Sequence, residues 1–381
     1  MKFEKYPFEK LTELFSDISP NDGREAVSLT IGEPQFETPD FIRKELEREA
    51  HLLNRYPKTA GEGYLREAIL EYVANRFGLK LDDEHIIPTF GTRELLFNFP
   101  QFLLHDIDSP TMAFPNPFYQ IYEGAAIASG AKRVYLNLDK ENGFLPILDE
   151  EKLSKCDLVI LNSPNNPTSS VMDMDSMKEW VSMALKHDFV LLNDECYVDL
   201  YTGEPIPSLL EASVAVGNDS FHNVLVINSA SKRSSAPGLR SGFIAGDRDI
   251  LREYMRYRTY VGCASPLPLQ RAASKAWADS EHASYFRQKY RENFEMASEI
   301  LGTEIPEATF YLWLEVGDEI GFARELYRDY NLKVLPGSFL GREGAGEGFV
   351  RLALVYEGER MRDALGRVAD FINGWGDMLP R

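Results

Sequence analysis

A lysine and an arginine stand eight residues apart in a run of small and hydroxyl residues, SASKRSSAPGLRSG (229–242). The lysine, Lys232, follows the apolar run NVLVIN by four residues, and ligand sites form at the carboxyl ends of strands in open α/β sheets. Burial at such an edge favours the neutral amine, a carbonyl nucleophile that can form a Schiff base. A lysine packed against a carboxylate in a loop is the alternative.

Hydroxyl groups and a guanidinium surround this lysine. Ser229, Ser231 and Arg240 are donors that suit a phosphate dianion. A lysine beside a phosphate-binding cluster indicates pyridoxal phosphate as the cofactor. A loop rich in serine and glycine would have the same composition without any ligand.

An acidic residue and a tyrosine end a second apolar run, FVLLNDECY (189–197). Asp194 emerges from an apolar strand, where an ionised carboxylate needs a cationic partner. A protonated pyridine nitrogen is such a partner, and the protonated ring accepts electrons from a substrate carbanion. Tyr197 is placed to hydrogen-bond the phenolic oxygen of the ring. An Asp that caps the next element is the alternative.

Three further stretches carry polar or aromatic groups next to expected strands and helices. Asn166 in NNPT can donate to an oxygen anion. Thr92 in FGTR stands at an expected helix start, where free backbone N–H groups bind phosphate. Tyr119 in NPFY can stack on a planar cofactor. Local loop bonding, an ordinary helix cap and core packing are the respective alternatives.

The elements that must position these side chains are strands and helices that alternate through the middle of the chain. Amphipathic stretches at 92–105 and 174–188 have helical spacing and are the expected crossover helices. This alternation predicts an α/β unit around a mostly parallel sheet. Its expected strands lie in the apolar runs at 111–114, 133–138, 157–161, 189–193, 223–228 and 242–246.

The alternation stops after about residue 280. A long charged helix (284–301), strands within 308–316 and 348–355, and a terminal helix indicate a second, smaller α+β unit. The N-terminal segment completes it. The predicted organisation is therefore a small domain from residues 1–45 and 284–381, and a large cofactor-binding domain from residues 46–283.

Composition excludes several classes of partner. The chain has 381 residues with 60 acidic and 41 basic side chains, and its charge of −19 repels nucleic acids and anionic lipids. No apolar run approaches the roughly 20 residues that span a bilayer, and the N-terminus lacks signal-peptide features, so we expect a cytoplasmic location. Three scattered cysteines and six scattered histidines favour neither disulfides nor a metal site.

Taken in this order, the motifs resemble those of fold type I pyridoxal-phosphate enzymes of the class I/II aminotransferase family. The resemblance extends from LTIGEPQFETP (29–39) to GFVRLALV (348–355), and it rests on SxSK with its following arginine, DExY and NNPT. It implies a large domain with a mostly parallel seven-stranded sheet between helices, and a small α+β domain made from both termini.

The resemblance also implies roles in cofactor binding and catalysis. Lys232 would carry the cofactor and act as catalytic base and acid, with Asp194 at the pyridine nitrogen. Tyr197 and Asn166 would bind the phenolic oxygen, and Tyr119 would stack on the ring. The implied phosphate ligands are the backbone of Thr92 and Arg93, together with Ser229, Ser231 and Arg240.

For the amino acid and 2-oxo acid substrates, the resemblance implies that Arg351 and Asn166 bind the α-carboxylate, with a backbone N–H from Gly32. Tyr56 would reach the phosphate in the partner subunit, which implies a homodimer. Closure of the small domain on substrate is expected. Ser169 stands where the family commonly has glycine after NPT, which puts the backbone of that turn in question.

Four longer stretches resemble N-succinyldiaminopimelate aminotransferases: residues 91–97, 116–131, 231–243 and 256–273. They imply glutamate as donor and N-succinyl-2-amino-6-oxopimelate as acceptor, in diaminopimelate and lysine biosynthesis. Arg93, Lys58 and Arg258 are candidates for the distal carboxylates. The alternatives are an aspartate, aromatic or broad-specificity aminotransferase, a β-lyase, and a non-catalytic regulatory protein, which the intact lysine and aspartate disfavour.

Overall fold

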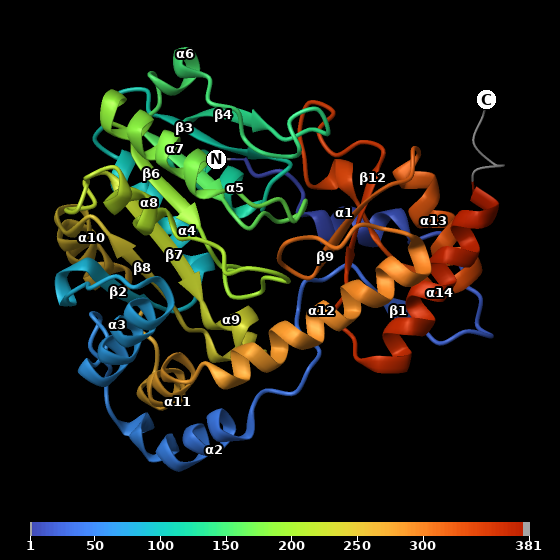
Figure 1. Cartoon of the computed structure of the whole chain (residues 1–381), viewed down its shortest axis with the longest axis horizontal. Coiled ribbons are helices and arrows are strands. Elements are labelled where there is room, and N and C mark those ends of the chain that lie inside the picture. The colour runs from blue at the N-terminus through green and yellow to red at the C-terminus, as the bar shows by residue number, and fades with distance from the viewer. Residues whose placement is uncertain (1, 376–381) are drawn as a thin grey trace.

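Seven strands form the central sheet of the computed structural model, which describes residues 2–375 (Figure 1). The strand order is β2-β8-β7-β6-β5-β3-β4, and β8 is the one strand of this sheet that runs antiparallel to its neighbours. The predicted mostly parallel seven-stranded sheet is therefore confirmed. The strands are β2 (Ile86–Thr89), β3 (Thr111–Asn116), β4 (Lys132–Asn137), β5 (Leu158–Asn162), β6 (Val190–Asp194), β7 (Val224–Ser229) and β8 (Gly242–Gly246).

The central strands are apolar at consecutive positions because helices cover both faces of the sheet. In β5, Leu158 and Ile160 belong to one buried cluster, whereas Val159 and Leu161 belong to another. Each of the six predicted strand runs starts within one residue of an observed strand. The remaining strand, β2, was not predicted because it is short, contains a proline and lies at the sheet edge.

Two groups of helices enclose the sheet. On one face lie α3 (Gly63–Phe77), α7 (Met174–His187), α8 (Leu209–Ala215) and α11 (Leu267–Ala278), whose apolar residues share a cluster. The other face is covered by α4 (Thr92–Leu104), α5 (Ile121–Ser129) and α10 (Arg248–Val261). The crossover helices predicted at 92–105 and 174–188 correspond to α4 and α7.

The smaller unit contains two further sheets. In one, β1 (Val27–Ser28) pairs with β10 (Leu332–Lys333); in the other, β12 (Phe349–Ala353) lies between β11 (Leu335–Pro336) and β9 (Tyr311–Glu315). One buried cluster joins residues from both ends of the chain, including Leu11 and Leu365. Its helices are α1 (Pro7–Leu14), α12 (Glu281–Leu301), α13 (Glu319–Tyr330) and α14 (Gly358–Trp375).

Two segments connect the units. The long helix α12 extends from the end of α11 toward α14 (Figure 1). The other connection is the segment 29–39, since α2 (Asp40–Glu49) already packs against α11 and η1 (Ala50–Asn54). The domain boundaries at 45 and 283 stay a prediction. Within residues 2–375, no helix combines the length and apolar character needed to cross a membrane.

Short helices complete the structure. α6 (Glu150–Leu153) and η2 (Asp83–His85) precede strands, and η4 (Gly337–Phe339) follows β11. More important for the site are α9 (Ala230–Arg233) and η3 (Pro237–Leu239), which occupy the turn between β7 and β8. This turn contains the lysine and arginine of the SASKRSSAPGLRSG run.

Candidate active site

A cavity of about 530 Å³ lies at the carboxyl ends of β5, β6 and β7 and is also lined by residues of the smaller unit. The predicted site residues line it, except Tyr56 and two of the three distal candidates, Lys58 and Arg258. Distant parts of the sequence are therefore brought together: 200 positions separate Lys232 from Gly32, and 321 separate Arg351 from Thr30, which are hydrogen-bonded pairs. This agrees with the rule that open α/β sheets place ligand sites at this edge.

Lys232 lies on the one-turn helix α9, directly after β7. The side chain of Ser229 caps this helix by accepting the N–H of Ser231 at 3.2 Å. The Lys232 ammonium donates to the carbonyl of Gly32, in the segment 29–39 that connects the two units. Burial lowers the pKa of Lys232 to about 8, which brings the loss of its proton close to the physiological range.

Asp194 ends β6 and is buried. Its carboxylate accepts the hydroxyl of Tyr122 at 2.8 Å and the N–H of Cys196 at 3.2 Å. Burial raises the pKa of Asp194, opposed by these hydrogen bonds. No cationic side chain within the described residues pairs with this carboxylate, so it suits a cationic ring nitrogen.

Tyr122 is a cavity residue that the motifs did not indicate. It lies three residues after Tyr119 on the first turn of α5, and both side chains line the cavity. Their spacing in NPFYQIY places two aromatic groups on adjacent turns of the chain, a signal that was available. What the sequence does not give is the partner, because Asp194 is 72 residues away.

A phosphate-sized group of donors converges at the start of α4. Thr92 and Arg93 open this helix after Gly91, whose φ of 75° suits glycine. A Cβ at Gly91 would lie 2.1 Å from Nη2 of Arg240, so glycine is required for the close approach of this arginine. Helix N–H groups, a guanidinium and the hydroxyl of Ser231, which accepts from the Ser229 hydroxyl at 3.0 Å and keeps its own proton to donate, fit a dianion.

Arg351 extends from β12 of the smaller unit and is buried. Its Nη1 donates to Asn166 Oδ1 at 2.6 Å and its Nη2 to the carbonyl of Thr30 at 2.6 Å. Its Nε has no hydrogen-bond partner within the described chain, and no acidic side chain there pairs with it. An arginine that is oriented by neutral groups keeps its charge for an incoming carboxylate.

Tyr197 shares a hydrogen bond with Tyr311 at 2.9 Å between the hydroxyl oxygens. Tyr311 also lies against Gly32, where a Cβ would approach its hydroxyl to 1.7 Å. The sequence indicated a strand around Tyr311 but no role at the site. Tyr311 therefore joins the smaller unit to the DExY loop.

The three residues predicted to bind the distal carboxylates of the substrate have different surroundings. Arg258 is fully buried and pairs with Glu94 at 2.7 Å, and Lys58 lies 3.6 Å from Glu62 with its side chain 73% exposed. Neither lines the cavity and both contact an acidic side chain, and their proposed role in substrate binding stays a prediction. Arg93 does line it; its Nε donates to the hydroxyl of Tyr119 at 2.7 Å.

The start of α1 also contributes to the cavity, which the sequence did not indicate. Tyr6 and Phe8 line it together with Ile31 and Leu340. These side chains supply an apolar and aromatic wall near Arg93. Glu33, at the surface, is the other acidic residue of the lining besides Asp194.

Ser169 adopts a left-handed conformation with φ of 64°, where glycine carries less strain. Its hydroxyl bonds Thr309 Oγ1 at 2.5 Å and donates to the carbonyl of Tyr311 at 2.9 Å. The serine thus keeps the turn that glycine commonly makes. Its hydrogen bonds compensate for the strained backbone.

Tyr56 lies outside the cavity and is 98% exposed. It follows η1, near the exposed side chain of Leu53 in sequence. Tyr260, at the end of α10, is 92% exposed. Both side chains are therefore accessible to a second molecule.

Comparison with known proteins gives concordant results. A family model described as aminotransferase class I and II matches residues 24–368. The chain is 30% identical to an LL-diaminopimelate aminotransferase of Natranaerobius thermophilus, over 92% of this chain and 93% of the relative. It is 32% identical to the 4-dedimethylamino-4-oxo-anhydrotetracycline transaminase OxyQ of Streptomyces rimosus, over 90% and 92%.

Solved structures agree along nearly the whole chain. The crystal structure of the aminotransferase AspB from Helicobacter pylori has a TM-score of 0.96 at 48% identity, covering 98% of this chain and 100% of that one. An aminotransferase from Neisseria meningitidis has a TM-score of 0.92 at 39% identity, covering 98% of each chain.

Proposed function

The chain belongs to the aminotransferase class I and II family, and from this premise we propose that it transfers an amino group between glutamate and N-succinyl-2-amino-6-oxopimelate. The family, the transaminase activity and the cofactor pyridoxal phosphate, all predicted from the motifs, are confirmed. Enzymes of this family act on amino and 2-oxo acids and are generally dimeric. The identity of the acceptor is the new part of the proposal.

When bound, pyridoxal phosphate supplies an electron sink for the substrate's α-carbon. In the proposed site, Asp194 would pair with the charged ring nitrogen, Tyr197 and Asn166 would bind the phenolic oxygen, and Tyr119 would contact the ring. The donors at the start of α4, together with Ser229, Ser231 and Arg240, would hold the phosphate. The fit rests on the unpaired carboxylate of Asp194 and the cluster of donors around Gly91.

Lys232 is the proposed base and acid. Its Nζ would take the proton from the α-carbon of the amino acid and, in the opposite half-reaction, deliver a proton to the α-carbon derived from the 2-oxo acid, which requires a pKa near the working pH. The pKa of about 8 that burial produces meets this requirement. Arg351 orients the substrate by its α-carboxylate, with the N–H of Gly32 as a further donor.

The observation that carries the choice of acceptor is Arg93. Three cations of the cavity have assigned roles: Lys232, Arg240 and Arg351. Arg93 is a fourth cation in the lining, and no acidic side chain of the described residues pairs with it. A substrate with a second anionic end accounts for this arginine, while Tyr6 and Phe8 offer apolar contact to the methylene chain between the two ends.

LL-diaminopimelate is the second candidate, because several relatives are named as its aminotransferases. Its distal end bears an ammonium as well as a carboxylate. Succinylation removes that positive charge and adds a carboxylate, so the acylated substrate is the better partner for an unpaired arginine. Charge complementarity with Arg93 therefore favours the succinylated compound.

We expect the enzyme to be a homodimer in which Tyr56 reaches the phosphate of the partner's site. The support is the near-complete exposure of Tyr56 and Tyr260, together with the dimeric state that enzymes of this family generally have. Sedimentation velocity gives the oligomeric state. A Tyr56→Phe variant that forms dimers yet binds the cofactor less tightly would support the contact across the subunits.

The Arg93→Gln variant tests the acceptor. Loss of a charge-assisted hydrogen bond predicts a fall in kcat/KM for N-succinyl-LL-diaminopimelate of about 10- to 100-fold, while the half-reaction with alanine, which has no second carboxylate, stays unchanged. The matched control is Arg133→Gln, since Arg133 lies outside the cavity. Equal losses for both substrates would contradict the proposal.

A further inference from the structure

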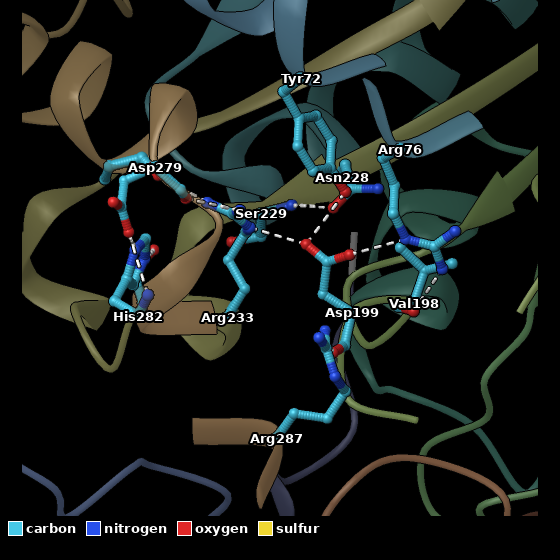
Figure 2. Close-up of polar contacts among 12 residues, drawn as sticks. Tyr72, Arg76, Val198, Asp199, Asn228, Ser229, Arg233, Asp279, His282 and Arg287 are labelled. Carbon is cyan, nitrogen blue, oxygen red and sulfur yellow. Dashed lines mark hydrogen bonds and ion pairs between the residues drawn. The ribbon is translucent and has the colours of Figure 1, made fainter. Parts of the chain in front are cut away.

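A buried ion-pair network surrounds Arg233, the residue that follows the active-site lysine in the sequence (Figure 2). The carboxylate of Asp199 accepts Nε of Arg233 at 2.6 Å, Nε of Arg76 at 3.1 Å and the hydroxyl of Tyr72 at 3.1 Å. The two arginines approach the carboxylate from opposite sides in Figure 2. The arginines lower the pKa of Asp199 against the effect of burial, so this carboxylate is ionised.

Arg233 directly follows Lys232, but it does not line the cavity. Its exposed fraction is 2%. Besides Asp199, it donates to the carbonyl of Ala276 at 2.6 Å and to that of Asp279 at 3.2 Å. The rings of Tyr72 and Trp277 lie 4.9 and 5.2 Å from its guanidinium carbon. Every direction around this guanidinium is therefore occupied.

The helix that carries Lys232 depends on such anchors. α9 contains four residues, and one turn of helix has little stability of its own. The Ser229 cap fixes its first turn, and Arg233 fixes its last residue. Asp199 lies five residues after Asp194 and two after Tyr197. The Arg233–Asp199 pair therefore joins α9, which carries Lys232, to the segment that carries Asp194 and Tyr197.

The same network reaches the start of α12. Asp279, whose carbonyl accepts Arg233, stands between α11 and α12, and its carboxylate contacts His282 Nδ1 at 2.5 Å. His282 Nε2 in turn contacts the hydroxyl of Ser234 at 2.8 Å. Residues 233 and 234 thus connect the lysine to the helix that leads into the smaller unit.

We propose that Arg233 is a positioning residue, which holds α9 against Asp199 so that Lys232 keeps a fixed place relative to Asp194 and Tyr197. Arg233 touches neither cofactor nor substrate. The inference concerns the transamination step itself, and it holds whichever acceptor the enzyme uses. The guanidinium of Arg233 binds both Asp199 and the carbonyl of Asp279, so the same residue also holds α9 against the start of α12.

Arg76 provides the matched control. It pairs with the same carboxylate and donates to the carbonyls of Val198 and Ile206 at 3.1 and 2.9 Å, but it belongs to α3 and makes no bond to α9. Removing either arginine leaves Asp199 with one cationic partner. The two substitutions therefore cost similar interactions, and only one releases the lysine segment.

The test compares Arg233→Met with Arg76→Met as holoenzymes. Both should lower the melting temperature. Arg233→Met should also lower kcat with glutamate by about 10- to 100-fold, the effect of misplacing a catalytic group, with KM little changed. The visible circular dichroism of the bound cofactor, which reports its fixed orientation, should weaken in this variant and keep the wild-type amplitude in Arg76→Met.

Equal losses of kcat and dichroism in the two variants would overturn the proposal, as would an Arg233→Met enzyme with wild-type values. Should Arg233→Met not fold, Arg233→Lys decides: a lysine can reach Asp199 but cannot hold both carbonyls as well. Reduced kcat and dichroism in a folded Arg233→Lys enzyme would support positioning. Wild-type values in that enzyme would refute it.

Discussion

Replacing Tyr122 by phenylalanine should slow the chemical step without disturbing the fold. The substitution removes one hydroxyl from the buried core of the sheet and one of the two hydrogen bonds to Asp194. A hydrogen bond to a charged group contributes about 1.5–3 kcal/mol. Because this bond stabilises the ionised carboxylate, its loss should raise the pKa of Asp194 further.

A more basic Asp194 competes for the proton of the ring nitrogen, so the ring accepts electrons less well. If the whole energy is lost in the transition state, the rate falls by about 10- to 150-fold. Stopped-flow absorbance of the holoenzyme with saturating glutamate measures this rate. KM should change little, because Tyr122 makes no bond to Arg351 or Arg93.

The matched control is Tyr135→Phe. Tyr135 also donates to a carboxylate, that of Glu123, at 3.2 Å, but it lies outside the cavity. This variant should react at the wild-type rate. A Tyr122→Phe enzyme that also reacts at the wild-type rate would refute the link between Tyr122, Asp194 and the ring nitrogen.

Two further predictions follow from the same site. Gly91→Ala should weaken cofactor binding by about tenfold or more in a titration with pyridoxal phosphate, since its Cβ would collide with Arg240. The control is Gly130→Ala, which has a similar φ of 72° and open space around it and should bind the cofactor normally. In the cofactor-free protein, the pKa of Lys232 is about 8 in the folded state and 10.5 in the unfolded state. Between these pH values the unfolded state binds more protons, so the free energy of unfolding should rise with pH, by up to about 3 kcal/mol. Urea unfolding of Lys232→Met should lack this rise, and an identical pH profile in the two proteins would contradict the assignment.

The sequence predicts well those features that depend on neighbouring residues. Lys232, Asp194 and Asn166 each follow a recognisable apolar run, and the runs themselves identify six strands of the central sheet. The cofactor follows from the types of residue at the strand ends. No knowledge of the packing is needed for these conclusions.

Features that depend on distant partners were missed. Arg258 looked free in the sequence because its partner, Glu94, is 164 residues away. Tyr311 and Tyr6 reach the cavity only because the smaller unit folds against the larger one. Arg233 stands beside Lys232 and could be taken for a substrate ligand, but successive helical residues point in different directions and its charge is used by Asp199.

The most direct test of the proposed activity is a coupled assay of the purified holoenzyme with 2-oxoglutarate and one amino donor at a time. The donors are N-succinyl-LL-diaminopimelate, LL-diaminopimelate, aspartate and an aromatic amino acid. We predict the highest kcat/KM for N-succinyl-LL-diaminopimelate, with glutamate formed in equal amount. A higher kcat/KM for any other donor, or equal values for all, would contradict the proposed substrate.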